Sequence, residues 1–145
     1  MAITSAICTS FKQELLVGTH NFTATTGNTF KIALYTSSAS LGAGTTAYST
    51  SNEITNSSGT AYTAGGATLT SVTPTTDSTT AVCDFADVSY TSASFTANGA
   101  LIYNDTQSDK AVAVIAFGSD KTVTSGTFTI QFPTADATNA IIRLA

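Results

Sequence analysis

The segment AVAVIAF (111–117) is a continuous apolar run, and the segment TFTIQF (127–132) alternates apolar with polar residues. A short continuous apolar run indicates a strand buried on both faces, whereas alternation with period two indicates a strand with one solvent-facing side. Between them, GSDK (118–121) has the composition of a turn, and Pro133 is expected to end the second strand. These segments predict that the core of the protein is a β-sheet.

Similar patterns predict strands through most of the remaining chain. Residues 104–110 are expected to form a polar turn, and Gly99 a β-bulge. The other predicted strands cover residues 29–36, 67–72 (ended by Pro74), 80–90, 94–103 and 141–144. About seven or eight strands with frequent turn signals predict an all-β fold, an antiparallel β-sandwich or jelly roll. We expect a single β-sandwich domain (19–145) preceded by an N-terminal arm with a short helix (1–18).

The helix of this arm is predicted at residues 10–17. Ser10 followed by Gln13 matches a capping box, and Gly18 is a common C-terminal stop. The apolar side chains at helical spacing are Phe11, Leu15 and Leu16. A helix of about two turns is not stable alone in water, so its apolar stripe is expected to dock on the β domain or on a neighbouring subunit.

A long stretch rich in Ser, Thr, Gly and Ala covers residues 37–66 and is predicted to form loops. Tyr48 and Tyr62 are among its few large side chains, and tyrosines in such a loop resemble a recognition surface. The alternative is that they hold the loop against its own sandwich. Together with Phe11 and Leu15, these two tyrosines are the predicted interface residues.

The chain is poor in charge. Charged residues make up 10% of the sequence, against about 25% in an average globular protein. The net charge is −4, and the basic residues are scattered along the chain rather than clustered as in nucleic-acid-binding proteins. Neither nucleic acid nor an anionic membrane is therefore an expected partner. The N-terminus lacks the pattern of a secretory signal, and no apolar run approaches the ~18 residues of a membrane span.

Residues that carry nucleophilic or metal chemistry are few. His20 is the only histidine, and no G-x-S-x-G motif accompanies it, so we expect it to be structural or solvated. Cys8 and Cys83 are far apart and in no C-x-x-C pattern, which favours two buried small side chains over a disulfide, although the pairing stays open. No metal or cofactor is predicted, and an enzyme is the least expected class of protein.

The carboxylates also lack a catalytic pattern. Glycosidases need two of them across a sugar, but Asp84 and Asp87 are odd-spaced and would point to opposite faces of a strand. Asp105 and Asp109 lie in a polar turn, where we expect them to aid turn formation; calcium binding is the alternative, without support from an EF-hand motif. The glycines of residues 41–44 lack the Lys-Ser/Thr of a phosphate-binding loop.

Seven segments carry a resemblance to a known group of proteins: TSFKQELL (9–16), GTHNF (18–22), TFKIALYT (29–36), YTAGG (62–66), ALIY (100–103), FPTA (132–135) and AIIR (140–143). As a set they resemble small structural proteins of tailed bacteriophages, and the resemblance covers essentially the whole chain. None of them includes a catalytic residue. The resemblance implies a structural component of the virion, without fixing its position on the particle.

Three hypotheses follow from this resemblance. The first is a head-decoration or cement protein on the capsid exterior, a homo-oligomer expected to be a trimer, made in the host cytoplasm. It would bind the major capsid protein through residues 1–18 or 37–66. The second is a head-fibre or tail-tip adhesin that recognises a host surface, motivated by Tyr48 and Tyr62. The third, a tail-tube or neck component, rests on analogy alone.

Overall fold

The computed structural model describes residues 2–55 and 61–145. Ten elements follow one another along the chain: β1 (Ala6–Ile7), α1 (Thr9–Leu16), β2 (Phe30–Tyr35), β3 (Ala67–Thr68), β4 (Ser71–Asp77), β5 (Thr80–Phe85), β6 (Val88–Asn104), the 3₁₀ helix η1 (Asp105–Gln107), β7 (Lys110–Ile130) and β8 (Ile142–Leu144). The structure confirms the predicted all-β, sandwich-like single domain with one short helix near the N-terminus.

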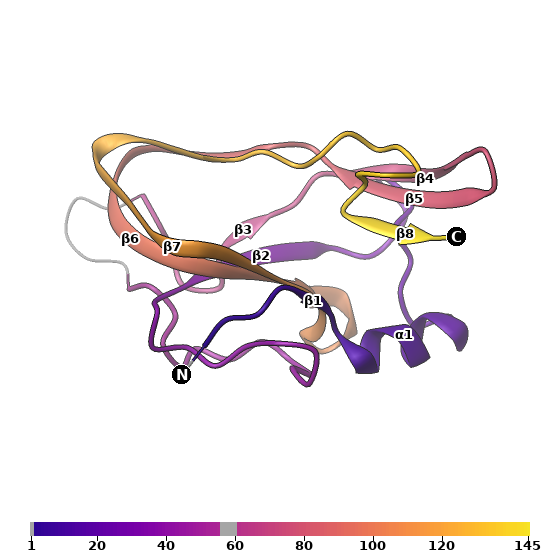
Figure 1. Ribbon diagram of the computed structural model, residues 1–145, viewed down its shortest axis with the longest axis horizontal. Helices are drawn as coiled ribbons and strands as arrows, with labels where there is room; N and C mark the ends of the chain where they lie inside the picture. Colours follow the sequence, from indigo (N-terminus) through magenta and orange to yellow (C-terminus); the bar gives the residue numbers. More distant parts are fainter. Residues whose placement is uncertain (1, 56–60) are drawn as a thin grey trace.

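The strands form two antiparallel sheets. The larger has the order β1-β7-β6-β2-β3 and the smaller the order β4-β5-β8. β1 belongs to the large sheet, where Ala6 pairs with Val114, so the N-terminal arm is built into the sandwich. Figure 1 shows the small sheet and α1 at the same end of the molecule, on opposite sides of it.

The longest feature is the hairpin of β6 and β7, which folds back over itself (Figure 1). Ala97 pairs with Lys121 and Gly99 pairs with Ala116, so residues 117–120 of β7 lie opposite Asn98 alone. Extra residues on one strand bend both strands and increase their twist. The bend divides the hairpin into a lower arm near η1 and an upper arm that includes residues 121–130 of β7.

This bend corrects one prediction and confirms another. Segment 118–121 does not end a strand, because β7 continues through it to Ile130, and the bulge absorbs its polar residues. Asn98 donates a hydrogen bond to Asp120 across the bulge (2.8 Å). The predicted bulge at Gly99 is confirmed, since the pairing register shifts between Ala97 and Gly99.

Two further strand boundaries differ from prediction. Pro74 does not end a strand but lies inside β4, an edge strand of the small sheet, where the register with β5 shifts between Val72 and Thr75. An edge strand with a bulge can accept proline because no ladder hydrogen bond is required of its nitrogen there. The predicted strand 80–90 is divided between β5 and β6, and the second of these takes in the whole predicted strand 94–103.

The helix α1 has the predicted stop but not the predicted start. The backbone N–H groups of Gly18 and Thr19 donate to the carbonyls of Leu15 and Glu14, with Gly18 at φ +76°, as in a Schellman motif. At the other end the N-cap is Cys8, without a side-chain hydrogen bond, so the predicted capping box at Ser10 is wrong. The N-cap lies two residues before the predicted one, and the helix begins at Thr9, one residue before the predicted range of 10–17.

The core between the layers is rich in phenylalanine. Phe30 of β2 stacks on Phe22 (ring centroids 4.3 Å apart), and both contact Phe85 of β5, which joins the large sheet to the small one. Phe11 of α1 meets Phe22 edge-on and is 1% exposed. Such aromatic pairs add to the free energy gained by burying their apolar area.

The bend supplies the first testable prediction. A Cβ atom at Gly99 would lie 2.7 Å from Cγ2 of Ile3 and 2.8 Å from the carbonyl oxygen of Ile115, both too close. We expect Gly99→Ala to lower the free energy of unfolding by about 1–3 kcal/mol through overpacking, measured by urea denaturation. Gly44→Ala is the matched control, because its Cβ would meet nothing within 4 Å. Equal stability of the two variants would contradict this account of the bend.

Candidate functional site

Glu53 lies at the centre of a buried polar cluster. The residue is 7% exposed, and its carboxylate accepts hydrogen bonds from Tyr48 Oη (2.7 Å), from Tyr62 Oη and from the backbone N–H of Gly65 (2.7 Å). No cation lies within 4 Å of this carboxylate among the described residues. Buried polar groups need partners, and here hydroxyl and amide donors supply them in place of a salt bridge.

The five tyrosines of the chain gather around this carboxylate. Tyr48 stacks on Tyr103 with ring centroids 4.6 Å apart, and the Tyr103 hydroxyl donates to the carbonyl of Gly65 (2.6 Å). Burial, together with the negative charge of Glu53, raises the pKa of Tyr90 to about 12. The same two causes raise the pKa of the other four phenols above the ordinary range: Tyr35, Tyr48, Tyr62 and Tyr103.

The cluster also completes the edge of β2. β3 pairs with β2 only at Lys31 and Ile32, so the following residues of β2 pair with β6 on one side and have no named strand on the other. Leu34 instead donates its N–H to the Tyr62 hydroxyl (3.0 Å) and accepts at its carbonyl from the N–H of Ile54 (3.0 Å). The Glu53 cluster therefore fastens the segments that carry Tyr48, Glu53 and Tyr62 to the sheet.

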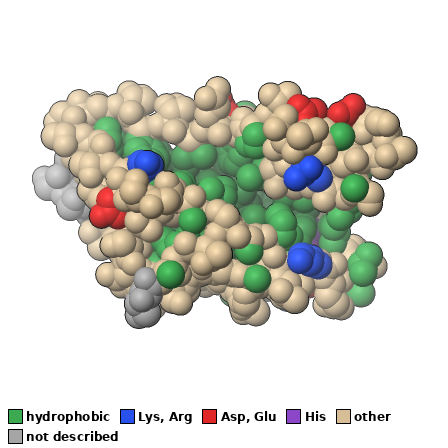
Figure 2. Space-filling view, viewed as in Figure 1, with side chains coloured by type: hydrophobic (Ala, Val, Ile, Leu, Met, Phe, Trp, Pro, Cys, Tyr) green, Lys and Arg blue, Asp and Glu red, His purple; other side chains and the backbone are tan. Residues whose placement is uncertain are grey.

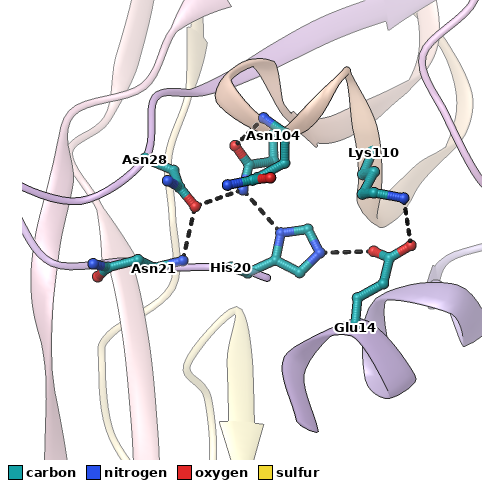
Figure 3. Close-up of polar contacts among 7 residues, drawn as sticks. Glu14, His20, Asn21, Asn28, Asn104 and Lys110 are labelled. Carbon is teal, nitrogen blue, oxygen red and sulfur yellow. Dashed lines mark hydrogen bonds and ion pairs between the residues drawn. The ribbon is translucent and has the colours of Figure 1, made fainter. Parts of the chain in front are cut away.

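A second buried network surrounds His20, whose side chain is closed to solvent (Figure 3). Its Nε2 lies 2.7 Å from Oε2 of Glu14 on α1, and its Nδ1 lies 2.9 Å from Nδ2 of Asn104 at the end of β6. Lys110 of β7 approaches the other carboxylate oxygen of Glu14 (3.4 Å). These contacts join α1 to the β6–β7 hairpin.

The hydrogen bonds around Asn104 decide the tautomer of His20. Oδ1 of Asn104 accepts from the backbone N–H of Gln107, and its Nδ2 donates to Oδ1 of Asn28, which also accepts from the N–H of Asn21. The amide nitrogen of Asn104 therefore faces Nδ1 of His20 as a donor, which leaves the ring proton on Nε2 toward Glu14. With both ring nitrogens engaged, the imidazole has no atom free to accept a proton from a substrate hydroxyl.

The cysteines are free, and neither is reactive in character. Burial raises the pKa of each thiol, Cys8 and Cys83, to about 11. A thiol with so high a pKa holds little thiolate at neutral pH and is a poor nucleophile. Ser10 has a buried hydroxyl oxygen without a hydrogen-bond partner among the described residues, and no contact joins it to His20.

The aspartates considered in the sequence serve backbone and surface contacts. Asp84 accepts from the N–H of Phe85, and Asp87 from the N–H of Phe132. Asp105 forms an ion pair with Lys31 (3.1 Å). Within residues 2–55 and 61–145, no three His, Cys, Asp or Glu side chains are grouped closely enough to hold a metal ion.

The structure does not bring the four predicted interface residues into one exposed surface. Phe11 and Tyr62 are 1% and 0% exposed, so any effect of theirs on a partner would be indirect. Leu15 and Tyr48 are partly buried against the core, and Tyr48 faces Glu53. Leu16, which lies at helical spacing from the docking stripe of Phe11 and Leu15, is 88% exposed.

An apolar hollow, which we call the trough, opens between the two arms of β7. Six of its lining side chains are hydrophobic: Ile115, Phe117, Phe128, Ile130, Phe132 and Ile141. Its volume is about 630 Å³, and a smaller hollow of about 310 Å³ beside β1 shares Ile115 and Ile141 with it. Figure 2 looks into this face and shows hydrophobic side chains gathered between the upper and lower rims.

A second apolar groove, of about 560 Å³, lies between α1 and the small sheet. Its lining includes Leu15, Thr73 and Leu144. The large hydrophobic side chains that are exposed in the described chain lie in or next to this lining: Leu16, Val17, Val72 and Leu144. Grouped exposure of this kind is typical of surfaces that contact other molecules.

Comparison with protein-family models, with curated proteins and with solved structures finds no match. Among the described residues, no helix is long and apolar enough to cross a bilayer. The sequence interpretation missed the role of Glu53, for which one signal existed. Glu53 is the only charged residue between Lys31 and Asp77, and a lone charge in so long a neutral stretch needs a specific environment.

The Glu53 cluster leads to a prediction about stability. We expect Glu53→Ala to lower the free energy of unfolding by about 3 kcal/mol, because three buried donors lose their acceptor. Tyr48→Phe should cost about 1 kcal/mol, since it removes one hydrogen bond and keeps the ring stack. Asp120→Asn controls for loss of an exposed negative charge, because the amide oxygen of Asn can still accept the hydrogen bond from Asn98. Urea denaturation measures all three, and a Glu53→Ala variant as stable as the control would contradict a structural role for the cluster.

The raised pKa values of the tyrosines predict a pH dependence. Unfolded tyrosines ionise near pH ~10, so above that pH the unfolded chain loses protons that the folded chain retains. The corresponding stability is fully present below pH ~10 and declines as the pH rises further. Absorbance at 295 nm should therefore show delayed phenol ionisation in the native protein and ordinary ionisation in urea. Ordinary titration of the native protein would contradict the packing described here.

Proposed function

We propose that this protein is a non-enzymatic structural subunit of a tailed-phage particle, acting as a decoration or cement protein on the head. The observation that carries the proposal is the contrast between its interior and its surface. The only histidine and both glutamates are engaged in buried networks that hold the fold together. The apolar groove beside α1 and the trough, in contrast, remain open at the surface.

The outer face of the upper arm is suited to dense packing of subunits. Exposed hydroxyls meet across the strands in the pairs Ser89–Thr129 (3.0 Å) and Thr96–Thr122 (2.9 Å). Hydroxyl-rich surfaces form wet, hydrogen-bonded contacts, and few charges means little repulsion between neighbouring copies. Many weak contacts repeated over a symmetric shell give strong total binding.

The burial of the tyrosines weakens the alternative function, a head-fibre or tail-tip adhesin. That proposal depended on Tyr48 and Tyr62 being available to a host molecule. Both hydroxyls donate to Glu53, and Tyr62 is 0% exposed. We therefore favour the cement function, in which the contacts come from the surface of the N-terminal arm, including the exposed end of α1, and from the apolar groove beside it.

The cement function can be tested by comparing phage heads that contain the protein with heads that lack it. Heads that lack the protein should release their DNA at a lower temperature and after milder osmotic shock than complete heads, and adding back purified protein should restore both properties. Unchanged stability would overturn the cement function. Copy number, read from a stained gel of purified particles, separates the alternatives, because decoration requires hundreds of copies whereas a tail or fibre component is present in about a dozen or fewer.

A further inference from the structure

The upper arm of β7 has one unpaired edge. Residues 121–123 and 128–130 pair with β6 on one side, with two register shifts around Gly126 between them, and among the described residues no backbone hydrogen bond from another segment reaches the opposite side. β1 covers β7 only in the lower arm, at Ala113 and Val114. An open strand edge is a row of N–H and C=O groups ready to pair with an added strand.

The side chains beside this edge are incompletely covered. On β6, the core-facing Ala93 and Ala97 are 0% exposed. Phe128 and Ile130, which face the trough from β7, are only partly buried. Burial thus decreases toward the open edge, and a segment lying along it would cover the trough as well as the backbone.

The charge of Lys121 indicates what kind of segment would fit the trough. Lys121 lines the trough, and it has no carboxylate within 4 Å among the described residues. Within the described part of the chain, its ammonium group has one hydrogen-bond partner, the hydroxyl of Ser119 (3.1 Å), and the residues that line the trough include no acid. The complementary partner is apolar along its length, with a carboxylate that reaches Lys121.

We propose that the trough binds an extended segment of a different polypeptide, which adds as a strand to the free edge of residues 121–130. Its alternate apolar side chains enter the trough, and its carboxylate pairs with Lys121. This mode of recognition takes affinity from main-chain hydrogen bonds and specificity from the pockets beside them. The inference adds a partner to the proposed function, but the binding itself is tested on the purified protein without any particle.

A second copy of this chain is the less suitable occupant. Residues 121–130 contain Lys121 and no carboxylate, so two copies of this edge would bring no opposite charge to either lysine. The nearest acid, Asp120, is already bonded to Asn98 in the bulge. A lysine on a strand edge is a common means of discouraging pairing between identical edges.

The test uses a synthetic eight-residue peptide in which Val alternates with Thr and one end carries Asp. Hydrogen exchange followed by NMR should show new protection at amides within residues 121–130 when the peptide is added. The same peptide with alternate backbone nitrogens methylated should not bind, because it cannot complete the ladder. A peptide with Lys in place of Asp should bind more weakly.

Reversing the charge of Lys121 tests whether the peptide binds beside this residue. Lys121→Glu should weaken binding of the Asp peptide about fivefold and strengthen binding of the Lys peptide, as expected for a surface ion pair. Lys12→Glu is the matched control, since Lys12 is exposed on α1 and does not line the trough. Circular dichroism and the native NMR spectrum verify that both variants are folded.

Several outcomes would overturn the proposal. They are no binding of any peptide at millimolar concentration, binding without protection of residues 121–130, and equal effects of the two lysine variants. A dimer in sedimentation experiments that protects the same amides without peptide would assign the edge to a second copy instead. Loss of head stability without the protein, combined with failure of peptide binding, would leave the cement function standing and remove only this inference.

Discussion

A single bulge determines the architecture of this protein. At Asn98, four residues of β7 face one residue of β6, and the longest hairpin bends so that its two arms become parts of opposite layers. The core lies between those arms, and the trough opens where they separate. Because β6 and β7 stay paired on both sides of the bend, one hairpin contributes to both layers, and the separate small sheet of β4, β5 and β8 adds to the layer of the upper arm. Gly99 permits it, since a side chain there would collide with Ile3 and with the backbone of Ile115.

Two carboxylates, that of Glu53 buried and that of Glu14 partly buried, fix the parts that the hairpin does not. Glu14 joins α1 to His20 and Lys110. Glu53 holds Tyr48 and Tyr62, and the Tyr62 hydroxyl in turn bonds to Leu34 of β2. Desolvating a carboxylate is costly unless its hydrogen bonds are complete, so each network favours one arrangement of the segments it joins over looser alternatives. Although the chain has few charges, two of them, on Glu14 and Glu53, stabilise its fold. Much of the polar surface is made of hydroxyl groups instead.

Local patterns predicted the elements better than their connections. The run 111–117 was recognised because a strand buried on both faces has no polar position, and Gly18 because its left-handed conformation ends a helix. The segment 118–121 was misread as a turn, since turns and large bulges have the same polar, glycine-containing composition. The acceptor of the Tyr48 and Tyr62 hydroxyls could not be read from the sequence, because those contacts depend on how a loop folds back on the sheet. The free edge of β7 is likewise a property of strand order, which no local pattern encodes.

The clustering of all five tyrosines around Glu53 also determines the optical behaviour of the protein. With no tryptophan and no disulfide, absorbance near 280 nm comes almost entirely from this one region. Tyr48 and Tyr62 are hydrogen-bonded to the Glu53 carboxylate, and such phenols emit weakly, so the fluorescence of the protein should increase when Glu53 and these two tyrosines separate. Intrinsic fluorescence consequently reports mainly the opening of this one part of the molecule.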